Sequence, residues 1–289
     1  MSNMNIHRRT CMSVLAALVG GSALGAAPAP MAIKDLSCHR RVAAPIPAPT
    51  GTTLVLIDST TPKDRAAFES LQAMLRKLLH HRRERVVLAT FAGLAAGEFP
   101  HEVGRVFQEP RPTEALRRDL VISDVELLDN CLPTLWARNL AAVQTAITAQ
   151  VASSPLGEYS EIAYALRWAA LEVLPNLPTR QSLRVLVFSD GLLHSRSGQS
   201  FYLKQQPRPI NVDKELMLLQ STGLNLPPRF VPRAFDLYWI GLGATAQGSK
   251  QYQRPADVEA LKSFWSKAAS QYGANVTQIG LTVSTDALK

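Results

Sequence analysis

The sequence predicts an α/β fold in which a doubly wound, mostly parallel six-stranded sheet carries helices on both faces. Two continuous apolar runs, residues 54–57 and 185–188, have the length of strands buried on both sides. Helical patterns alternate with strand segments along the chain, as in parallel sheets built with crossover helices. Asp58 and Asp190 follow the two runs, and open α/β sheets bind ligands at this end of their strands.

The strands are predicted from short apolar segments bounded by turn residues. The third is short and is stopped by Pro110, and its loop from the second strand is short enough for an antiparallel hairpin. The other five follow helical segments or begin the domain, which favours a parallel arrangement. In chain order, the expected strands are residues 52–58, 85–91, 104–108, 183–189, 235–242 and 275–279.

The helices are predicted from apolar residues at helical spacing and from end signals. Phe68, Leu71 and Leu75 place one apolar face on the first of them. Pro255 near the first turn and Gly273 just past the end mark the boundaries of the last. In chain order, the expected helices are residues 64–80, 113–128, 135–151, 160–174, 212–220 and 255–272.

The amino-acid composition indicates a folded protein with a basic surface. Of 289 residues, 46% are hydrophobic and 19% are charged, so the chain can fill a core. The formal net charge of +8 permits contact with acidic partners or anionic membrane surfaces. Motifs for nucleotide binding, zinc hydrolysis or a serine nucleophile elbow are missing from the sequence, so we expect no enzyme of those classes.

The N-terminus has the three parts of an export signal. Arg8 and Arg9 precede an apolar stretch, residues 11–24, and small residues follow it. We expect residues 1–25 to be a signal peptide and the protein to be periplasmic or secreted. An uncleaved signal would instead anchor it at the inner membrane, the one route to membrane contact. Export also argues against nucleic acid as a partner.

Residues 26–50 are rich in proline and alanine and are expected to form an extended linker. The folded domain is then residues 51–284. After signal cleavage Cys38 and Cys131 would be the remaining cysteines. They could form one disulfide in an oxidising compartment or stay as two free thiols, and the sequence leaves both open.

Oxygen-bearing side chains gather at the predicted carboxyl ends of the strands. Asp58 and Thr60 stand two apart after the first strand, Ser160 opens a helix, and Asp190 ends the fourth strand. Such groups are ligands for a hard cation, so Mg²⁺ or Mn²⁺ is the expected cofactor. Taken singly, each has a plain structural explanation as a helix cap or turn residue.

These motifs resemble those of von Willebrand factor A-type domains, over about residues 51–280. Asp58-Ser59-Thr60-Thr61-Pro62 is similar to the family's Asp-x-Ser-x-Ser, Ser160 stands six residues before Leu166 as the family's Thr does, and Asp190-Gly191 follows the fourth strand. The resemblance implies a metal site of Asp58, Thr60, Ser160 and Asp190 that a partner's acidic side chain completes. Pro62 replaces the last hydroxyl, which implies weaker metal binding.

The loop over residues 192–209 is expected to lie on the same rim and to bind a protein partner. It carries aromatic and basic side chains, which are favoured in interfaces: Phe201, Tyr202, Lys204 and Arg208. A loop whose aromatic side chains tuck into the domain is the alternative.

Protein–protein interaction at this rim is therefore the expected function, with two alternatives. One is a metal-free structural component of a cell-envelope assembly. The other is a phosphatase-like hydrolase with Asp58 as nucleophile, which resembles the haloacid dehalogenase type. That family has a second aspartate two residues on, where this chain has Thr60, so the general acid would be missing.

Overall fold

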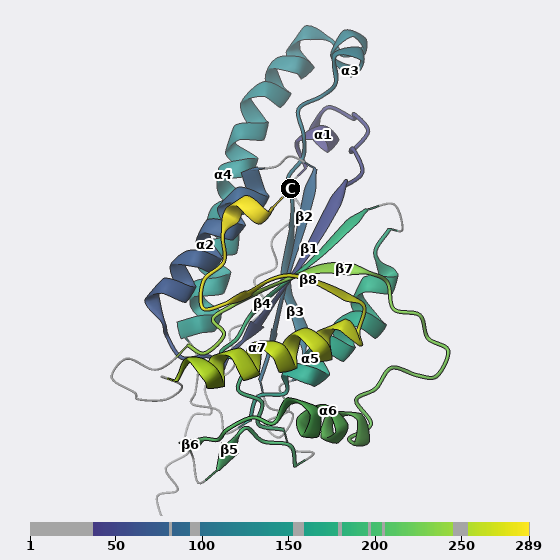
Figure 1. Ribbon diagram of the computed structural model, residues 1–289. Helices are drawn as coiled ribbons and strands as arrows, with labels where there is room; N and C mark the ends of the chain where they lie inside the picture. The colour runs from purple at the N-terminus through teal and green to yellow at the C-terminus, as the bar shows by residue number, and fades with distance from the viewer. Residues whose placement is uncertain are drawn as a thin grey trace, which may run out of the picture.

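The computed structural model describes residues 37–80, 83–92, 99–152, 159–178, 181–195, 198–203, 206–244 and 254–288 (Figure 1). A six-stranded sheet at its centre has the order β3-β2-β1-β4-β7-β8. Within this sheet β3 is antiparallel to its neighbour and every other pairing is parallel. Its strands are β1 (Gly51–Asp58), β2 (Glu84–Phe91), β3 (His101–Phe107), β4 (Ser182–Phe188), β7 (Phe235–Ile240) and β8 (Ala274–Gly280).

Helices connect these strands, and a small ribbon of β5 (Tyr202–Leu203) and β6 (Gln206–Pro207) follows β4. The α-helices are α1 (Cys38–Arg41), α2 (Arg65–His80), α3 (Glu114–Asp119), α4 (Ile122–Ala152), α5 (Ile162–Trp168), α6 (Val212–Ser221) and α7 (Pro255–Ser270). A π-helical turn (Ala169–Val173) and a 3₁₀ turn (Leu174–Asn176) extend α5, and a 3₁₀ turn (Thr285–Ala287) lies near the C-terminus. Among the described helices, none combines the length and apolar character needed to cross a bilayer.

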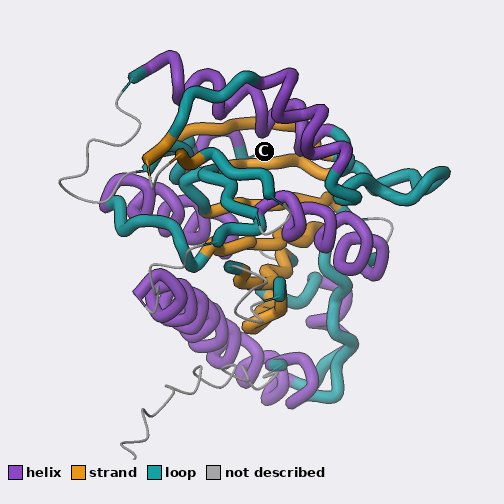
Figure 2. Tube along the Cα trace, turned by 90° about the horizontal axis from the view of Figure 1, so that it is seen from below, coloured by secondary structure: helices purple, strands orange, loops and turns teal. Residues whose placement is uncertain are grey.

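The sheet separates two apolar cores, which explains why its strands read as continuous apolar runs. Along β1, Leu54 and Leu56 pack into the core beneath α5, α6 and α7, whereas Val55 and Ile57 pack against α2 and α4. Figure 2 shows helices on both sides of the stacked strands. The α/β class, the six strands and the antiparallel third strand are confirmed.

The predicted break between two helices at residues 129–134 is wrong. One helix, α4, runs through Pro133, and the chain turns instead at Leu120, between α3 and α4. A proline inside a helix removes a hydrogen bond and costs about 3 kcal/mol. Leu128 and Leu132 on either side are fully buried, and each contributes roughly 1.5–3 kcal/mol. Burial of this face therefore outweighs the proline.

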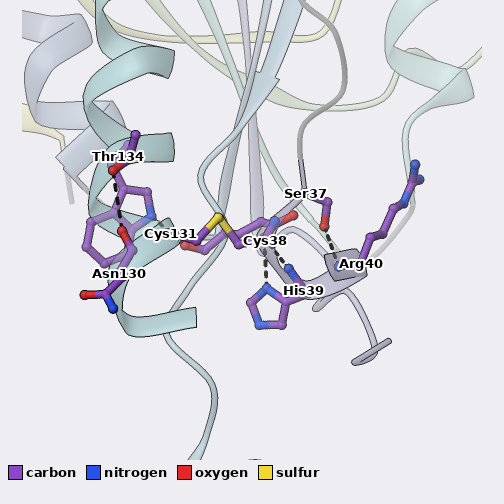
Figure 3. Close-up of a disulfide and its surroundings, with 9 residues drawn as sticks. Ser37, Cys38, His39, Arg40, Asn130, Cys131 and Thr134 are labelled. Carbon is purple, nitrogen blue, oxygen red and sulfur yellow. Dashed lines mark hydrogen bonds and ion pairs between the residues drawn. A yellow bond between two sulfur atoms is a disulfide. The ribbon is translucent and has the colours of Figure 1, made fainter. Parts of the chain in front are cut away.

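The structure differs from the predicted linker at residues 38–44. A disulfide joins Cys38 of α1 to Cys131 of α4, with 5.8 Å between their Cα atoms (Figure 3). Val42 and Ala44 are buried in a small cluster with Leu132. The proline- and alanine-rich composition indicated an extended chain, but the covalent link and this apolar contact fix the segment on α4. The predicted signal peptide and residues 26–36 lie outside the described residues.

Candidate functional site

The strand order creates a topological switch point between β1 and β4. From β1 the chain continues to β2 and β3 on one side of the sheet, whereas β4, β7 and β8 extend it on the other. Crossovers that diverge in this way leave a crevice at the carboxyl ends of the two central strands, where open α/β sheets bind ligands. Asp58 is the last residue of β1, and Asp190 follows the end of β4 by two residues.

The carboxylate of Asp58 gathers hydroxyl groups from three separate segments. Its side chain is buried, with 1% exposure. Oδ1 accepts hydrogen bonds from the backbone N–H of Thr60 at 2.9 Å and from its Oγ1 at 2.6 Å. Oδ2 accepts from the hydroxyls of Ser160 at 2.8 Å and Ser189 at 2.7 Å. These bonds hold both carboxylate oxygens in fixed positions.

Asp190 is the second buried acid of this site. It is 4% exposed, and its Oδ1 accepts a hydrogen bond from the N–H of Leu192 at 2.9 Å. Burial raises the pKa of Asp190 well above its ordinary value, and the charge of Asp58 raises it further. Burial also raises the pKa of Asp58, although its hydrogen bonds lower it in part. Neither carboxylate forms an ion pair with a basic side chain in the part of the chain that the structure describes.

Ser160 reaches Asp58 because the strand-like segment before α5 is held by His194. The two residues exchange backbone hydrogen bonds, from Ser160 N to His194 O at 3.0 Å and from His194 N to Ser160 O at 3.2 Å. The N-cap position of α5 is Glu161, so Ser160 is not the helix cap that its sequence position suggested. Its hydroxyl is directed at the acid instead.

A glycine turn and two indole groups fix the position of Asp190. Gly191 has a φ of +79°, a conformation that glycine adopts without strain. A Cβ there would come within 2.5 Å of Leu242. The indole N–H of Trp265 donates to Gly191 O at 2.8 Å, and that of Trp239 donates to Ser189 O at 2.9 Å. The two buried indole groups thus hold the loop around Gly191 in place through hydrogen bonds to its backbone carbonyls.

The structure brings Asp58, Thr60 and Ser160 into direct contact and places Asp190 beside them, as the sequence predicted. Ser189 is a member that the prediction missed. It ended the predicted fourth strand next to Asp190, which is the signal that could have identified it. Among the described residues, no cluster of three or more His, Cys, Asp or Glu side chains could hold a metal. A cation at this site would therefore depend on two carboxylates and the hydroxyls around them.

This site lacks a complete set of hydroxyl groups, and Pro62 and Thr61 are the positions concerned. Pro62 has no hydroxyl to offer. The hydroxyl of Thr61 is buried and has no hydrogen-bond partner among the described residues. Orphaned buried hydroxyls are costly, and Thr61 is such a group three residues after Asp58.

The expectation of Phe201 as an exposed partner-binding anchor is wrong, and the stated alternative, an aromatic side chain that tucks into the domain, holds for it. Phe201 is fully buried, and its ring meets that of Phe264 edge to face at 5.1 Å. Arg208 lies over the Phe201 ring at 6.0 Å and forms an ion pair with Glu215 at 2.7 Å. Burial of the Phe201 side chain in the core stabilises the fold more than exposure on the rim would. Arg208 covers its ring. Lys204 and the side chain of Tyr202 lie outside the described residues.

The sequence prediction also missed two ring contacts, which involve Tyr159 and Tyr164 on either side of Ser160. The Tyr159 ring stacks on that of His194 at 4.7 Å. Phe99, which is 54% exposed, contacts Tyr164 edge to face at 6.4 Å. These four side chains are exposed or half-buried, so they offer aromatic surface outside the buried core.

The sequence matches no protein-family profile and no curated protein. Two solved structures resemble the chain at 10% sequence identity. Proximal thread matrix protein 1 from the mussel byssus has a TM-score of 0.33, with 78% of this chain and 46% of that chain covered. The open conformation of the pilus adhesin SpaC from Lactobacillus rhamnosus GG has a TM-score of 0.37, with 84% and 29% covered. The chain thus spans less than half the length of either.

Proposed function

We propose that this chain is an exported protein-interaction module of the von Willebrand factor A type, which binds a protein partner at the carboxyl-terminal rim of its sheet. One observation carries the proposal. The buried Asp58 collects the hydroxyls of Thr60, Ser160 and Ser189 at the switch point, with a second buried acid, Asp190, beside it. Residues far apart in sequence meet where this architecture binds ligands.

The donor chemistry fits Mg²⁺ or Mn²⁺. Two neighbouring buried carboxylates without a described basic partner are costly when both are ionised, and a divalent cation would neutralise them. The oxygens of Asp58, Asp190, Thr60 and Ser160 would hold the ion, with water in the remaining positions. When bound, the ion would supply an open coordination position for an acidic side chain of the partner.

The disulfide supports the proposed location. Disulfides persist in oxidising compartments and are rare in the cytosol, and Cys38 is joined to Cys131. Together with the signal-like N-terminus, this favours a periplasmic or secreted protein. Contact with the inner membrane would follow only from an uncleaved signal.

The hydrolase alternative is disfavoured by Thr60. It stands where the haloacid dehalogenase type has its second aspartate, so the general acid would be missing. A metal-free structural role remains the competing hypothesis. It predicts that Asp58→Ala and Asp190→Ala leave partner binding unchanged.

Thermal unfolding with Mg²⁺, Mn²⁺ or a chelator tests the metal site. A ligand that binds the native state alone raises the apparent stability, so we expect Tm to rise with metal in the wild type and not in Asp190→Ala. Asp213→Ala is the matched control, because its side chain is 86% exposed on α6, and it should retain the shift. A wild-type Tm that does not respond to metal would overturn the metal site.

Selection from a random peptide library on the immobilised protein tests the interaction. In Mn²⁺ we expect enrichment of peptides that carry Asp or Glu, with binding lost in chelator and in Asp190→Ala. Enriched peptides that bind equally well in chelator would contradict a metal-completed contact and favour the structural role.

A further inference from the structure

The disulfide between α1 and α4 lies in the wall of a cleft (Figure 3). Both Cys38 and Cys131 line this cleft, whose volume of about 500 Å³ is within the range typical of small-molecule pockets. Cys131 is half-buried, whereas Cys38 is 1% exposed. Cys131 is therefore the more accessible of the two cysteines to a thiol that enters the cleft.

The same cleft is positively charged, which favours reaction with a thiolate. Arg41 of α1 and Arg138 of α4 both line it, and no acidic residue does. Both arginines are exposed, and neither forms an ion pair within the described ranges. In thiol–disulfide exchange the attacking and the leaving sulfur are both thiolates. Nearby guanidinium groups stabilise thiolates, so they favour both the approach and the departure.

Glu109 holds Cys38 through contacts that do not involve its sulfur. The buried Oε2 of Glu109 accepts hydrogen bonds from the backbone N–H groups of Cys38 at 3.0 Å and His39 at 3.2 Å. It also contacts Nδ1 of His39 at 2.9 Å. These contacts keep Cys38 opposite Cys131 when the disulfide is open. A thiolate held beside its target reacts far faster than one in solution, so closure is favoured.

We infer that Cys38–Cys131 is a reactive disulfide that exchanges with small, negatively charged thiols. The thiolate attacks Sγ of Cys131 and forms a mixed disulfide, while the Cys38–Cys131 bond breaks and its electron pair leaves on Cys38 as a thiolate. The Cys38 thiolate can then attack Sγ of Cys131, expel the small thiolate and restore the original bond.

A second small thiol can instead complete the reduction. Its thiolate attacks the first thiol's sulfur in the mixed disulfide and releases Cys131 as a thiolate. The two small thiols are oxidised to one disulfide, and the protein disulfide is reduced to two thiols. Exchange places the attachment of α1 to α4 under the control of surrounding thiols. It uses no residue of the metal rim, so this inference and the proposed function can fail separately.

Reduction of the folded full chain by glutathione, an anionic thiol, tests the inference. Cys11→Ser removes the third cysteine of the sequence from every protein compared. We expect a rate proportional to the glutathione concentration, and the first mixed disulfide at Cys131 when acid-quenched samples are mapped by mass spectrometry. A rate independent of glutathione concentration would mean that the sulfurs react only after unfolding. That result, or a first mixed disulfide at Cys38, would overturn the inference.

Arginine variants test the selection of negatively charged thiols. Arg41→Gln and Arg138→Gln should each slow the reaction with glutathione by about threefold, the effect of one exposed charge contact. Arg76→Gln removes the same charge from an exposed position of α2 that does not line the cleft, and it should react like the wild type. Neutral 2-mercaptoethanol should be slowed less than glutathione. Equal glutathione rates in the wild type and both cleft variants would overturn this selection.

Glu109 variants test the closing step. The glutathione adduct is isolated in acid and returned to pH 8 without free thiol, and the release of glutathione is timed. Glu109→Ala should slow release by about tenfold, because Cys38 is no longer held beside its target. Glu109→Gln retains an oxygen that can accept from the Cys38 N–H and should close at nearly the wild-type rate, with circular dichroism checking the fold of both. Equal release in the Ala variant and the wild type would contradict the role of Glu109.

Discussion

The hydroxyl of Ser160 lies 2.8 Å from Oδ2 of Asp58, although 102 residues separate them in the sequence. This contact joins the end of β1 to the segment that precedes α5. The same carboxylate oxygen accepts from Ser189 at 2.7 Å. Asp58 is therefore held by groups on both sides of the switch point before any ion arrives.

Ser160→Ala should weaken both the metal response and the metal-free fold. Loss of a donor to a buried carboxylate costs about 1–3 kcal/mol, so the free energy of unfolding measured by urea in chelator should fall by that amount. The rise in Tm with Mn²⁺ should also shrink. Ser160→Thr retains the hydroxyl and should keep most of both quantities. Equal behaviour of the Ala and Thr variants would show that the hydroxyl is unimportant.

Asp190→Asn should change how metal-free stability depends on pH. Burial, and then the charge of Asp58, hold the pKa of Asp190 well above its ordinary value. A raised folded-state pKa gives stability that is complete below the unfolded-state pKa, about 3.9, and is lost as pH rises through the folded-state pKa. In chelator, the stability of the wild type minus that of Asp190→Asn should therefore fall as pH increases. Urea unfolding at several pH values measures this difference, and a constant difference would contradict the assignment.

Local patterns were enough to predict the sheet and most of its helices. Residues 54–57 had to be buried on both faces because four consecutive apolar residues leave no polar face, and the two cores on either side of β1 show this. The acids Asp58 and Asp190 could be placed together for a related reason, since parallel strands end at the same edge of a sheet.

Features that depend on distant contacts could not be predicted in the same way. The position of α1 rests on a disulfide across 93 residues, and composition contains no information about that distance. Phe201 was expected on the rim because aromatic side chains are favoured in interfaces, with burial as the alternative, but its place in the core is set by Phe264 of α7. Ser189 was missed because its hydroxyl is directed at Asp58 at the end of β1, and the sequence does not show where that end lies relative to Ser189.

The main effect of Phe201→Ala should be on the free energy of unfolding and not on partner binding. Truncation of a fully buried phenylalanine costs about 3–5 kcal/mol, because it removes apolar contact and leaves a cavity. Phe99→Ala is the matched control, since Phe99 is 54% exposed, and its effect on the free energy of unfolding should be much smaller. Chemical unfolding measures both variants. A stable Phe201→Ala with lost peptide binding would restore Phe201 as a surface anchor.

Removal of the disulfide should destabilise the attachment of α1 and the domain as a whole. A link that spans 93 residues restricts the unfolded chain strongly, and disulfides typically contribute about 2–4 kcal/mol. Cys38→Ser combined with Cys131→Ser should lower the free energy of unfolding by about this amount, as should reduction of the wild type. Reductant should then have no effect on the double variant, which controls for indirect effects of the reagent. Identical urea unfolding of the oxidised and reduced wild type would contradict a structural role, because it would mean that the apolar contacts of Val42 and Ala44 hold the segment without the covalent bond.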